Sequence, residues 1–219
     1  MKKLIVFGNS LLAKLTLFYF QRDKPYEIVG LTADKKFISC NEFCGLKVFP
    51  FETIEETHPP SEYDMFIAIG PSKMNQLREQ KFNEAKDKGY TLATYISRHA
   101  ICDSPLGENC FVSDMALIHP FVSIGNNNFF WEKVFIADDS CIQDHCYFSP
   151  TSATGTFSEI CSNSILGTGS IVKTGIKISK NTLIGASCYI SKNTKANGVY
   201  AKRNAEFLGQ CSDKIDISI

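Results

Sequence analysis

The sequence lacks the features that mark a membrane protein or a nucleic-acid-binding protein. No apolar run approaches the roughly 20 residues that a membrane-spanning helix needs, and the run Leu4-Ile5-Val6-Phe7 near the start breaks at Gly8. That run is also too short for a signal peptide. The 23 Lys and Arg residues equal the 23 Asp and Glu residues, and no basic stripe is visible, which argues against a nucleic-acid partner. We therefore expect a cytoplasmic protein with neither a membrane nor a nucleic acid as partner.

Patterns that bind metals are missing as well. The chain has nine cysteines but no C-x-x-C pair, and its closest spacing is Cys40 to Cys44. The four histidines are scattered along the chain, at His58, His99, His119 and His145. A catalytic zinc site needs three converging protein ligands, so we predict no metal. Several cysteines instead occupy small-residue positions of the repeat described next, where a thiol acts as a small hydrophobe.

What the sequence does contain is a six-residue repeat across its second half. Fourteen of the seventeen residues taken every sixth position from Ala100 to Ala196 are Leu, Val, Ile or Phe. A second series, from Ser104 to Thr194, is small except at Asn128 and Ile176. A period of six suits neither an α-helix nor an alternating strand, and a sandwich of strands would show turns spaced 8–12 residues apart.

Short strands separated by sharp corners explain this period. Each strand turns one large and one small side chain inward, three strands close a triangular coil, and stacked coils pair at about 4.8 Å. The register runs from Ala100 to Ala196 without insertion or deletion. We therefore predict an all-β left-handed parallel β-helix over residues 98–199, followed by a tail over residues 200–219.

Residues 1–97 are predicted to form a smaller α/β domain of Rossmann-like type. The expected elements are a strand Leu4 to Phe7, a turn Gly8-Asn9-Ser10, a helix Leu11 to Gln21 capped by Ser10, strands Glu27 to Thr32 and Met65 to Ile69, a helix capped by Ser72 that stops near Gly89, and a closing strand Leu92 to Ile96. Ligands of such a sheet bind at the carboxyl ends of its strands. A dinucleotide is not expected, because the first turn lacks the G-x-G-x-x-G pattern.

Over nearly its whole length the chain resembles a known family. The matching stretches are Met1 to Gly8, Pro60 to Gly70, Ser72 to Asn75, Pro120 to Asn127 and Ile142 to Phe148. The family is the bacterial nucleotide-sugar acetyltransferases of the sialic-acid O-acetyltransferase-like, hexapeptide-repeat group. The resemblance implies an acyltransferase of surface-glycan biosynthesis that takes acetyl-coenzyme A and a nucleotide-linked sugar. It also implies a homotrimer, with acetyl-coenzyme A in the groove between neighbouring β-helices.

The resemblance also assigns binding residues. It places the nucleotide part of the substrate on the glycine loops of the first domain, at Gly8, Asn9, Ser10, Asp34, Gly70, Ser72 and Lys73. A lysine there can answer the charge of a diphosphate. It places acetyl-coenzyme A at Thr156, Gly167, Gly185 and Ala186, although Thr156 stands where the family usually has glycine.

The catalytic position departs from the family pattern. The family frame reads Ile-x-His-(His/Asp/Glu)-x-x-Ile-x-Asp, and here Ile136 to Asp144 keep the frame but put Asp138 in place of the base histidine. Tyr147 likewise holds a position that is often a second histidine. A histidine with a pKa of about 6.5 is suited to base catalysis near pH 7, whereas an aspartate with a pKa of about 3.9 is not. The candidate catalytic residues are Asp138, Asp139 and, if a neighbouring subunit brings it into the groove, His145.

Two functions therefore remain open. An amine that is partly neutral at pH 7 can attack a thioester without a strong base, and binding supplies rate through proximity. We thus expect transfer to an amino group ahead of transfer to a hydroxyl. In the alternative, the chain has lost catalysis and serves as a sugar-nucleotide-binding or partner-binding subunit. Asp138 and Asp139 are then solvated corner residues.

Overall fold

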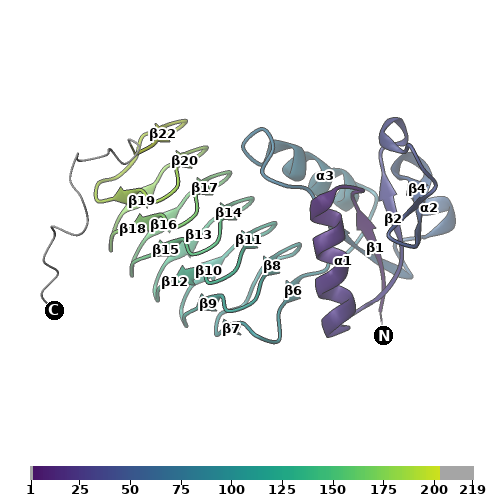
Figure 1. Cartoon of the computed structure of the whole chain (residues 1–219), viewed down its shortest axis with the longest axis horizontal. Helices are drawn as coiled ribbons and strands as arrows, with labels where there is room; N and C mark the ends of the chain where they lie inside the picture. Colours follow the sequence, from purple (N-terminus) through teal and green to yellow (C-terminus); the bar gives the residue numbers. More distant parts are fainter. Residues whose placement is uncertain (1, 203–219) are drawn as a thin grey trace, which may run out of the picture.

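The structure is a computed structural model that describes residues 2–202. A sheet with helices on both sides lies beside a long stack of coils (Figure 1). No helix in residues 2–202 combines the length and the apolar character needed to cross a membrane. Most of the tail predicted over residues 200–219 lies outside the described residues.

The first half contains a five-stranded sheet in the order β3-β4-β2-β1-β5. Its strands are β1 Lys3–Phe7, β2 Glu27–Ala33, β3 Glu42–Phe43, β4 Leu46–Pro50 and β5 Tyr63–Ile67. All pairings are parallel except that of β3 with β4. The helices are α1 Leu11–Asp23, α2 Ile54–Thr57 and α3 Gln76–Asp87, with 3-10 turns at Lys35–Phe37 and Phe51–Thr53.

Both faces of this sheet are apolar, as the continuous apolar runs of its strands predict. Leu4 and Val6 of β1 pack with α1, in one buried cluster. Ile5 and Phe7 point to the opposite face, where Phe82 of α3 covers them in a second cluster. Alternation along one strand therefore anchors helices on both sides of the sheet.

Several predictions for the first half were wrong in detail. Leu92 makes only a single bridge, to Met65, and Tyr95–Ile96 forms β6, which pairs with the coils rather than closing the sheet. The β3–β4 hairpin was missed, although Cys44 and Gly45 both have the positive φ (52° and 76°) of a two-residue hairpin turn.

The two predicted helix caps also differ in the structure. Ser10 occupies the N-cap position of α1, but its side chain makes no capping hydrogen bond. Asn75, not Ser72, is the N-cap residue of α3. Ser72 instead lies in the turn before it.

The second half consists of three parallel sheets, one for each face of a triangular prism. The docked face, which contacts the first half, is β6 Tyr95–Ile96, β8 Phe111–Val112, β11 Phe129–Phe130, β14 Tyr147–Phe148, β17 Ile165–Leu166, β20 Leu183–Ile184 and β22 Val199–Tyr200. The apolar face is β7 Ile101–Cys102, β9 Leu117–Ile118, β12 Phe135–Ile136, β15 Ala153–Thr154, β18 Ile171–Val172 and β21 Tyr189–Ile190. The polar face is β10 Ser123–Ile124, β13 Cys141–Ile142, β16 Glu159–Ile160 and β19 Lys177–Ile178.

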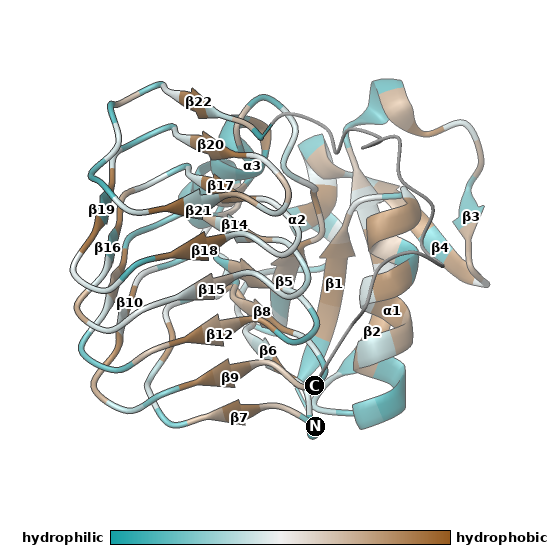
Figure 2. Cartoon of the chain, turned by 60° about the vertical axis from the view of Figure 1, so that its left-hand side comes forward, coloured by the Kyte–Doolittle hydropathy of each residue, from teal (hydrophilic) through white to brown (hydrophobic). Residues whose placement is uncertain are grey.

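These stacked parallel sheets fit the predicted left-handed β-helix. The inward series forms one continuous core from Val112 to Ile190, and Figure 2 shows its strands, most of them brown, stacked one above another. A corner residue with positive φ recurs every six residues from Met115 to Ser187. The six-residue register is therefore confirmed over this span.

The register breaks at both ends, contrary to the prediction. Cys102 pairs with Ile118, and Ile184 pairs with Tyr200, so the first and last coils are two residues shorter than the 18-residue coils between them. Ala100 and Ala196 thus fall outside the strand register. A terminal coil stacks on one neighbour only, so a corner can shorten there without disturbing a coil on its other side.

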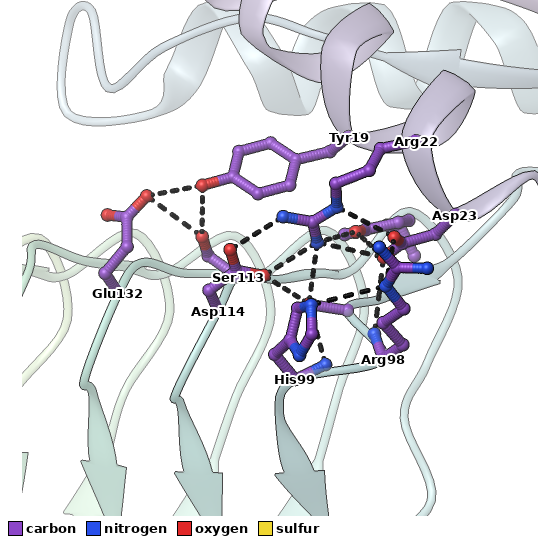
Figure 3. Close-up of polar contacts among 10 residues, drawn as sticks. Tyr19, Arg22, Asp23, Arg98, His99, Ser113, Asp114 and Glu132 are labelled. Carbon is purple, nitrogen blue, oxygen red and sulfur yellow. Dashed lines mark hydrogen bonds and ion pairs between the residues drawn. The ribbon is translucent and has the colours of Figure 1, made fainter.

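The two halves are joined by a shared core and by a polar network. Phe66 of β5 lies in the same buried cluster as Phe111 and Phe129 of the docked face. At the end of α1, the Arg22 guanidinium donates to both carboxylate oxygens of Asp114 at 2.8 Å and also to Asp23 (Figure 3). The coils therefore hold α1, and with it the sheet, in place.

Candidate functional site

A hollow of about 250 Å³ opens at the carboxyl ends of β1, β2 and β5. Its lining includes six of the seven residues that the resemblance assigns to the nucleotide: Gly8, Asn9, Ser10, Asp34, Gly70 and Ser72. They come together because parallel strands end at the same edge of the sheet. This is the position at which ligands of open α/β sheets bind.

Gly8 is required by the geometry of this edge. Its φ is +130°, its N–H donates to the Thr32 carbonyl at 2.8 Å, and a Cβ added there would lie 2.9 Å from the Ala68 carbonyl oxygen. Without a side chain, the chain can turn sharply from β1 toward α1. The start of α1 thereby faces the hollow, with Asn9 and Ser10 in its lining. The free N–H groups of a helix start favour an anion.

The lysine of this hollow is not the predicted one. Lys73 is exposed and belongs to a left-handed run with Met74 and Asn75 (φ 51°, 53° and 64°), and it lies outside the lining. Lys81 of α3 lines the hollow instead. Its place follows from the packing of α3, since Lys81 lies beside Phe82 on the buried side of the helix.

Lys81 is held by two carboxylates. Its Nζ lies 2.6 Å from Asp34 Oδ1 and 2.6 Å from Glu84 Oε2. Burial alone lowers the pKa of Lys81, but these two carboxylates outweigh it and raise the pKa above its ordinary value. Lys81 therefore stays protonated, and its charge is balanced by Asp34 and Glu84. The exposed ring of Phe37 and the side chain of Leu77 lie beside it in the lining. A ligand with a planar apolar part matches this lining, and the N–H groups at the start of α1 suit an anionic part.

Asp138 and Asp139 lie on the edge of the prism between the apolar and polar faces. Asp139 is an exposed corner residue with φ 54°. Asp138 turns toward the coil below, where its Oδ1 lies 3.6 Å from His119 Nδ1. Thr156 belongs to the same edge one coil above, since Phe157 N–H donates to the Asp138 carbonyl at 3.3 Å.

His119 is the residue of this edge that sequence reasoning passed over. It follows β9 directly and its ring meets that of Phe135 edge-on, with ring centroids 5.0 Å apart. Asp138 lies 19 residues after His119, one 18-residue coil plus one. The spacing could therefore have predicted the pair.

His145 lies on a different edge, between the polar and docked faces, and is not brought to Asp138 within the chain. Its Nδ1 is 2.8 Å from Asn127 Nδ2, its Nε2 is 3.7 Å from Glu79 Oε1, and its ring packs against Phe82. Burial lowers the pKa of His145, which favours the neutral ring. Within the chain α3 covers this histidine, and its approach to the Asp138 edge of a neighbouring subunit stays a prediction.

Tyr147 holds the position that is often a second histidine in the family, and its side chain is also engaged in packing. Its ring stacks on Phe129 of the coil below, with centroids 6.2 Å apart and an interplanar angle of 15°. Burial raises the pKa of its hydroxyl. Tyr147 therefore belongs to the contact between the two halves and not to the edge that carries Asp138.

The residues assigned to acetyl-coenzyme A divide between two edges. Gly167 lies directly under the next coil, where a Cβ added to it would be 2.7 Å from Ala186 N and 2.7 Å from Gly185 C. These three form a close stack at the edge between the docked and apolar faces. Thr156 is on the Asp138 edge. The four residues thus flank the apolar face on its two long sides.

Within residues 2–202, no three His, Cys, Asp or Glu side chains are grouped to hold a metal ion. No known protein-family profile matches the sequence.

Solved structures with the same architecture are found. A perosamine N-acetyltransferase from Caulobacter crescentus, in complex with CoA and GDP-perosamine, has 21% identity and a TM-score of 0.80, covering 91% of each chain. The acetyltransferase domain of PglB from Neisseria gonorrhoeae has 17% identity and a TM-score of 0.80, covering 91% of this chain and 96% of that one. WeeI from Acinetobacter baumannii has 18% identity and a TM-score of 0.79, with the same coverage.

These similarities show that the chain has the fold of hexapeptide-repeat acyltransferases. They extend over both halves of the chain. The sialic-acid O-acetyltransferase-like assignment made from the sequence stays a prediction.

Proposed function

We propose that this protein transfers an acetyl group from acetyl-coenzyme A to an amino group of a nucleotide-linked sugar, in the biosynthesis of a surface glycan. The observation that carries the proposal is the overlap of 91% of the chain, sheet and coils together, with a perosamine N-acetyltransferase bound to CoA and GDP-perosamine. The identity is 21%, so the activity of this chain depends on its own site residues.

The first half supports nucleotide binding. In the proposal, residues 1–97 act as a Rossmann-like domain whose hollow takes the nucleotide diphosphate. The start of α1 faces the phosphates, and the exposed Phe37 ring offers a surface for the base. Asn9 Nδ2 donates to the Phe37 carbonyl at 2.8 Å, which holds this ring close to the turn after β1.

The second half, residues 98–199, supports a site shared between copies of the chain. The outward residues of the apolar face are Ile101, Leu117, Phe135, Ala153, Ile171 and Tyr189, and Tyr189 and Ile101 are 60% and 57% exposed. Those of the polar face are Ser123, Cys141, Glu159 and Lys177. An exposed apolar strip of this length fits an interface with a further copy. A homotrimer packed on it would bring the Gly167 edge of one chain next to the Asp138 edge of another, with acetyl-coenzyme A between them.

One observation favours the alternative. Asp138 stands at the position of the family's base histidine, and His145 is engaged by α3. A chain that kept both binding surfaces without a base would serve as a sugar-nucleotide-binding or partner-binding subunit. For the same reason the proposal specifies an amine acceptor, whose neutral form attacks with less help than a hydroxyl needs.

The test is incubation with acetyl-coenzyme A and a panel of nucleotide-linked amino sugars, read by mass spectrometry. The matched control for each amino sugar is the sugar with a hydroxyl at the same carbon. Acetylation of an amino sugar, with none of its hydroxyl counterpart, is the expected result. Nucleotide binding without any transfer would favour the binding subunit.

A further inference from the structure

The edge that carries Asp138 also carries an imidazole from another coil. We propose that His119 is the catalytic base of this site and that Asp138 is the positioning residue that orients its ring. The pair rests on the proposed function. His119 lies outside the Ile136 to Asp144 frame, and Asp138, within that frame, orients the His119 ring.

The backbone at His119 is fixed from both neighbouring coils. His119 N–H donates to the Ile136 carbonyl of the coil above at 3.0 Å. Its own carbonyl accepts a hydrogen bond from the Ser104 hydroxyl of the coil below at 2.8 Å. The ring direction is then set by contact with Phe135 and Asp138. A base held in this way is placed as catalysis requires, by packing and by a supporting carboxylate.

The orientation leaves one ring nitrogen available. Nδ1 is the atom near Asp138, at 3.6 Å, and Nε2 has no hydrogen bond or ion pair to any other residue within 2–202, which leaves it available to a substrate. The His119 and Asp138 side chains are 35% and 40% exposed, which lets a ligand reach them. A separation of 3.6 Å is longer than a hydrogen bond, and such contacts often tighten only when substrate binds.

The pair also lies where the proposed shared groove would be. Phe135, whose ring touches His119, is an outward residue of the apolar face. A further copy of the chain that covers this face would shield one side of His119 and Asp138 from water. Thr156, assigned to acetyl-coenzyme A, is one coil above Asp138. Base, carboxylate and thioester would therefore meet on one edge.

The reaction needs only the two substrates of the proposed function, the sugar amine and the thioester of acetyl-coenzyme A. The neutral sugar amine attacks the thioester carbonyl carbon, so a C–N bond forms and the C–S bond breaks, with its electron pair leaving on sulfur. His119 Nε2 takes the proton that the nitrogen loses and passes it to the thiolate, which leaves as coenzyme A thiol. Asp138 stabilises the protonated ring through Nδ1–H.

The test compares His119→Asn, Asp138→Asn and the double variant, using steady-state kinetics on the best amino-sugar substrate. We expect His119→Asn to lower kcat by about 100-fold or more, the usual worth of one acid–base group, with little change in KM. Because Asp138 acts through His119, the double variant should be no slower than His119→Asn alone. Added imidazole should restore part of the kcat of His119→Ala. A purely structural role for His119 would give no such rescue.

His58→Asn is the matched control, because this histidine lies in the first half, where its ring packs against Phe49 and Tyr63, and it does not line the hollow. It should keep the kcat of the unmodified protein, and thermal melting should show all variants folded. An active protein in which His119→Asn keeps its kcat would overturn the pair alone. A protein that transfers acetyl to no amino sugar would overturn the proposed function and the pair together.

Discussion

The guanidinium of Arg78 lies 4.7 Å from the ring centre of Phe129 and so joins α3 to the docked face of the coils. Arg78 is completely buried. Its guanidinium donates to the Asn75 side chain at 3.0 Å, to the Ile69 carbonyl at 3.4 Å and to the carbonyls of Asn127, His145 and Cys146 at 3.2 to 3.3 Å. Burial lowers the pKa of Arg78 to about 10, so the group stays charged at neutral pH. One cation therefore ties the turn beside the hollow to three carbonyls of the coils.

Replacing Arg78 with Met should destabilise the protein by about 3 kcal/mol or more, because each buried polar group left unpaired costs roughly 1–3 kcal/mol. Arg78→Lys should recover only part of this, since an ammonium lacks the planar fork. Urea unfolding measures both. The control is Arg98→Ala, whose side chain is 60% exposed in its ion pair with Asp23 and should matter by about 1 kcal/mol or less. Similar losses for Arg78→Met and Arg98→Ala would contradict the role given to Arg78.

Acid should weaken the contact between α1 and the coils. The Arg22 hydrogen bonds hold the pKa values of Asp23 and Asp114 below their ordinary range. The unfolded chain, with aspartate pKa values of about 3.9, therefore takes up protons first as the pH falls. The stabilisation is complete above about pH 4 and is lost below it.

Asp114→Asn should thus be less stable at pH 7 and should show a flatter decline in its urea midpoint between about pH 4 and pH 2.5. Asp87→Asn, at the exposed end of α3, is the control and should follow the unmodified protein. If the urea midpoints of Asp114→Asn and of the unmodified protein fall in parallel, the ion pair between Arg22 and Asp114 contributes nothing to acid sensitivity.

The core of the coils should not tolerate a charge. Leu166 is completely buried in the inward series, so Leu166→Asp should cost several kcal/mol through an unpaired buried carboxylate. Leu11→Asp is the matched control, because Leu11 is 73% exposed on α1. Thermal melting should show a lower midpoint for Leu166→Asp than for Leu11→Asp. If Leu166→Asp melts like Leu11→Asp, the inward register is wrong.

The proposed homotrimer should depend on the apolar face. Light scattering after size exclusion should give three times the 24.4 kDa of one chain. Ile171→Glu, at an outward position of β18 that is 48% exposed, should dissociate it, because it would bury a charge in each interface. Ser123→Glu, at the equivalent outward position of the polar face, should leave it intact. A monomeric unmodified protein, or a trimeric Ile171→Glu, would refute the interface.

Nucleotide binding should be blocked by filling the hollow. A Cβ added to Gly70 has only the Leu12 side chain near it, at 4.0 Å, so Gly70→Trp should fold and project into the opening. Calorimetric titration with uridine, guanosine and thymidine diphosphates should show binding weakened at least about tenfold, or 1.4 kcal/mol. Ser61→Trp, on an exposed turn, is the control. Unchanged binding in Gly70→Trp would place the nucleotide elsewhere.

Much of the architecture could be predicted because it depends on a periodic pattern of residues that are close in the sequence. Every coil repeats the same large-then-small pattern, so the strands from Phe111 to Ile190 follow directly from it. The prediction of the register failed at the two terminal coils, which are two residues shorter than the others. The β3–β4 hairpin was missed because β3 is too short to give a recognisable sequence pattern. Strand ends predicted that Gly8 and Gly70 lie at one edge of the sheet, and both line the hollow there, whereas the place of Lys81 depends on how α3 turns toward the sheet.

The sequence alone determined the stack of coils, the crevice at the strand ends and the loss of the frame's histidine at Asp138. Only the tertiary structure decided that α3 covers His145. His119 comes one residue and His145 three residues after an inward isoleucine of the repeat, and only His119 reaches Asp138 across a coil. The physical reason is that a six-residue period sets which residues point in or out along one strand. Contacts between coils, and the docking of α3 through Arg78, are set by packing among residues far apart in the chain.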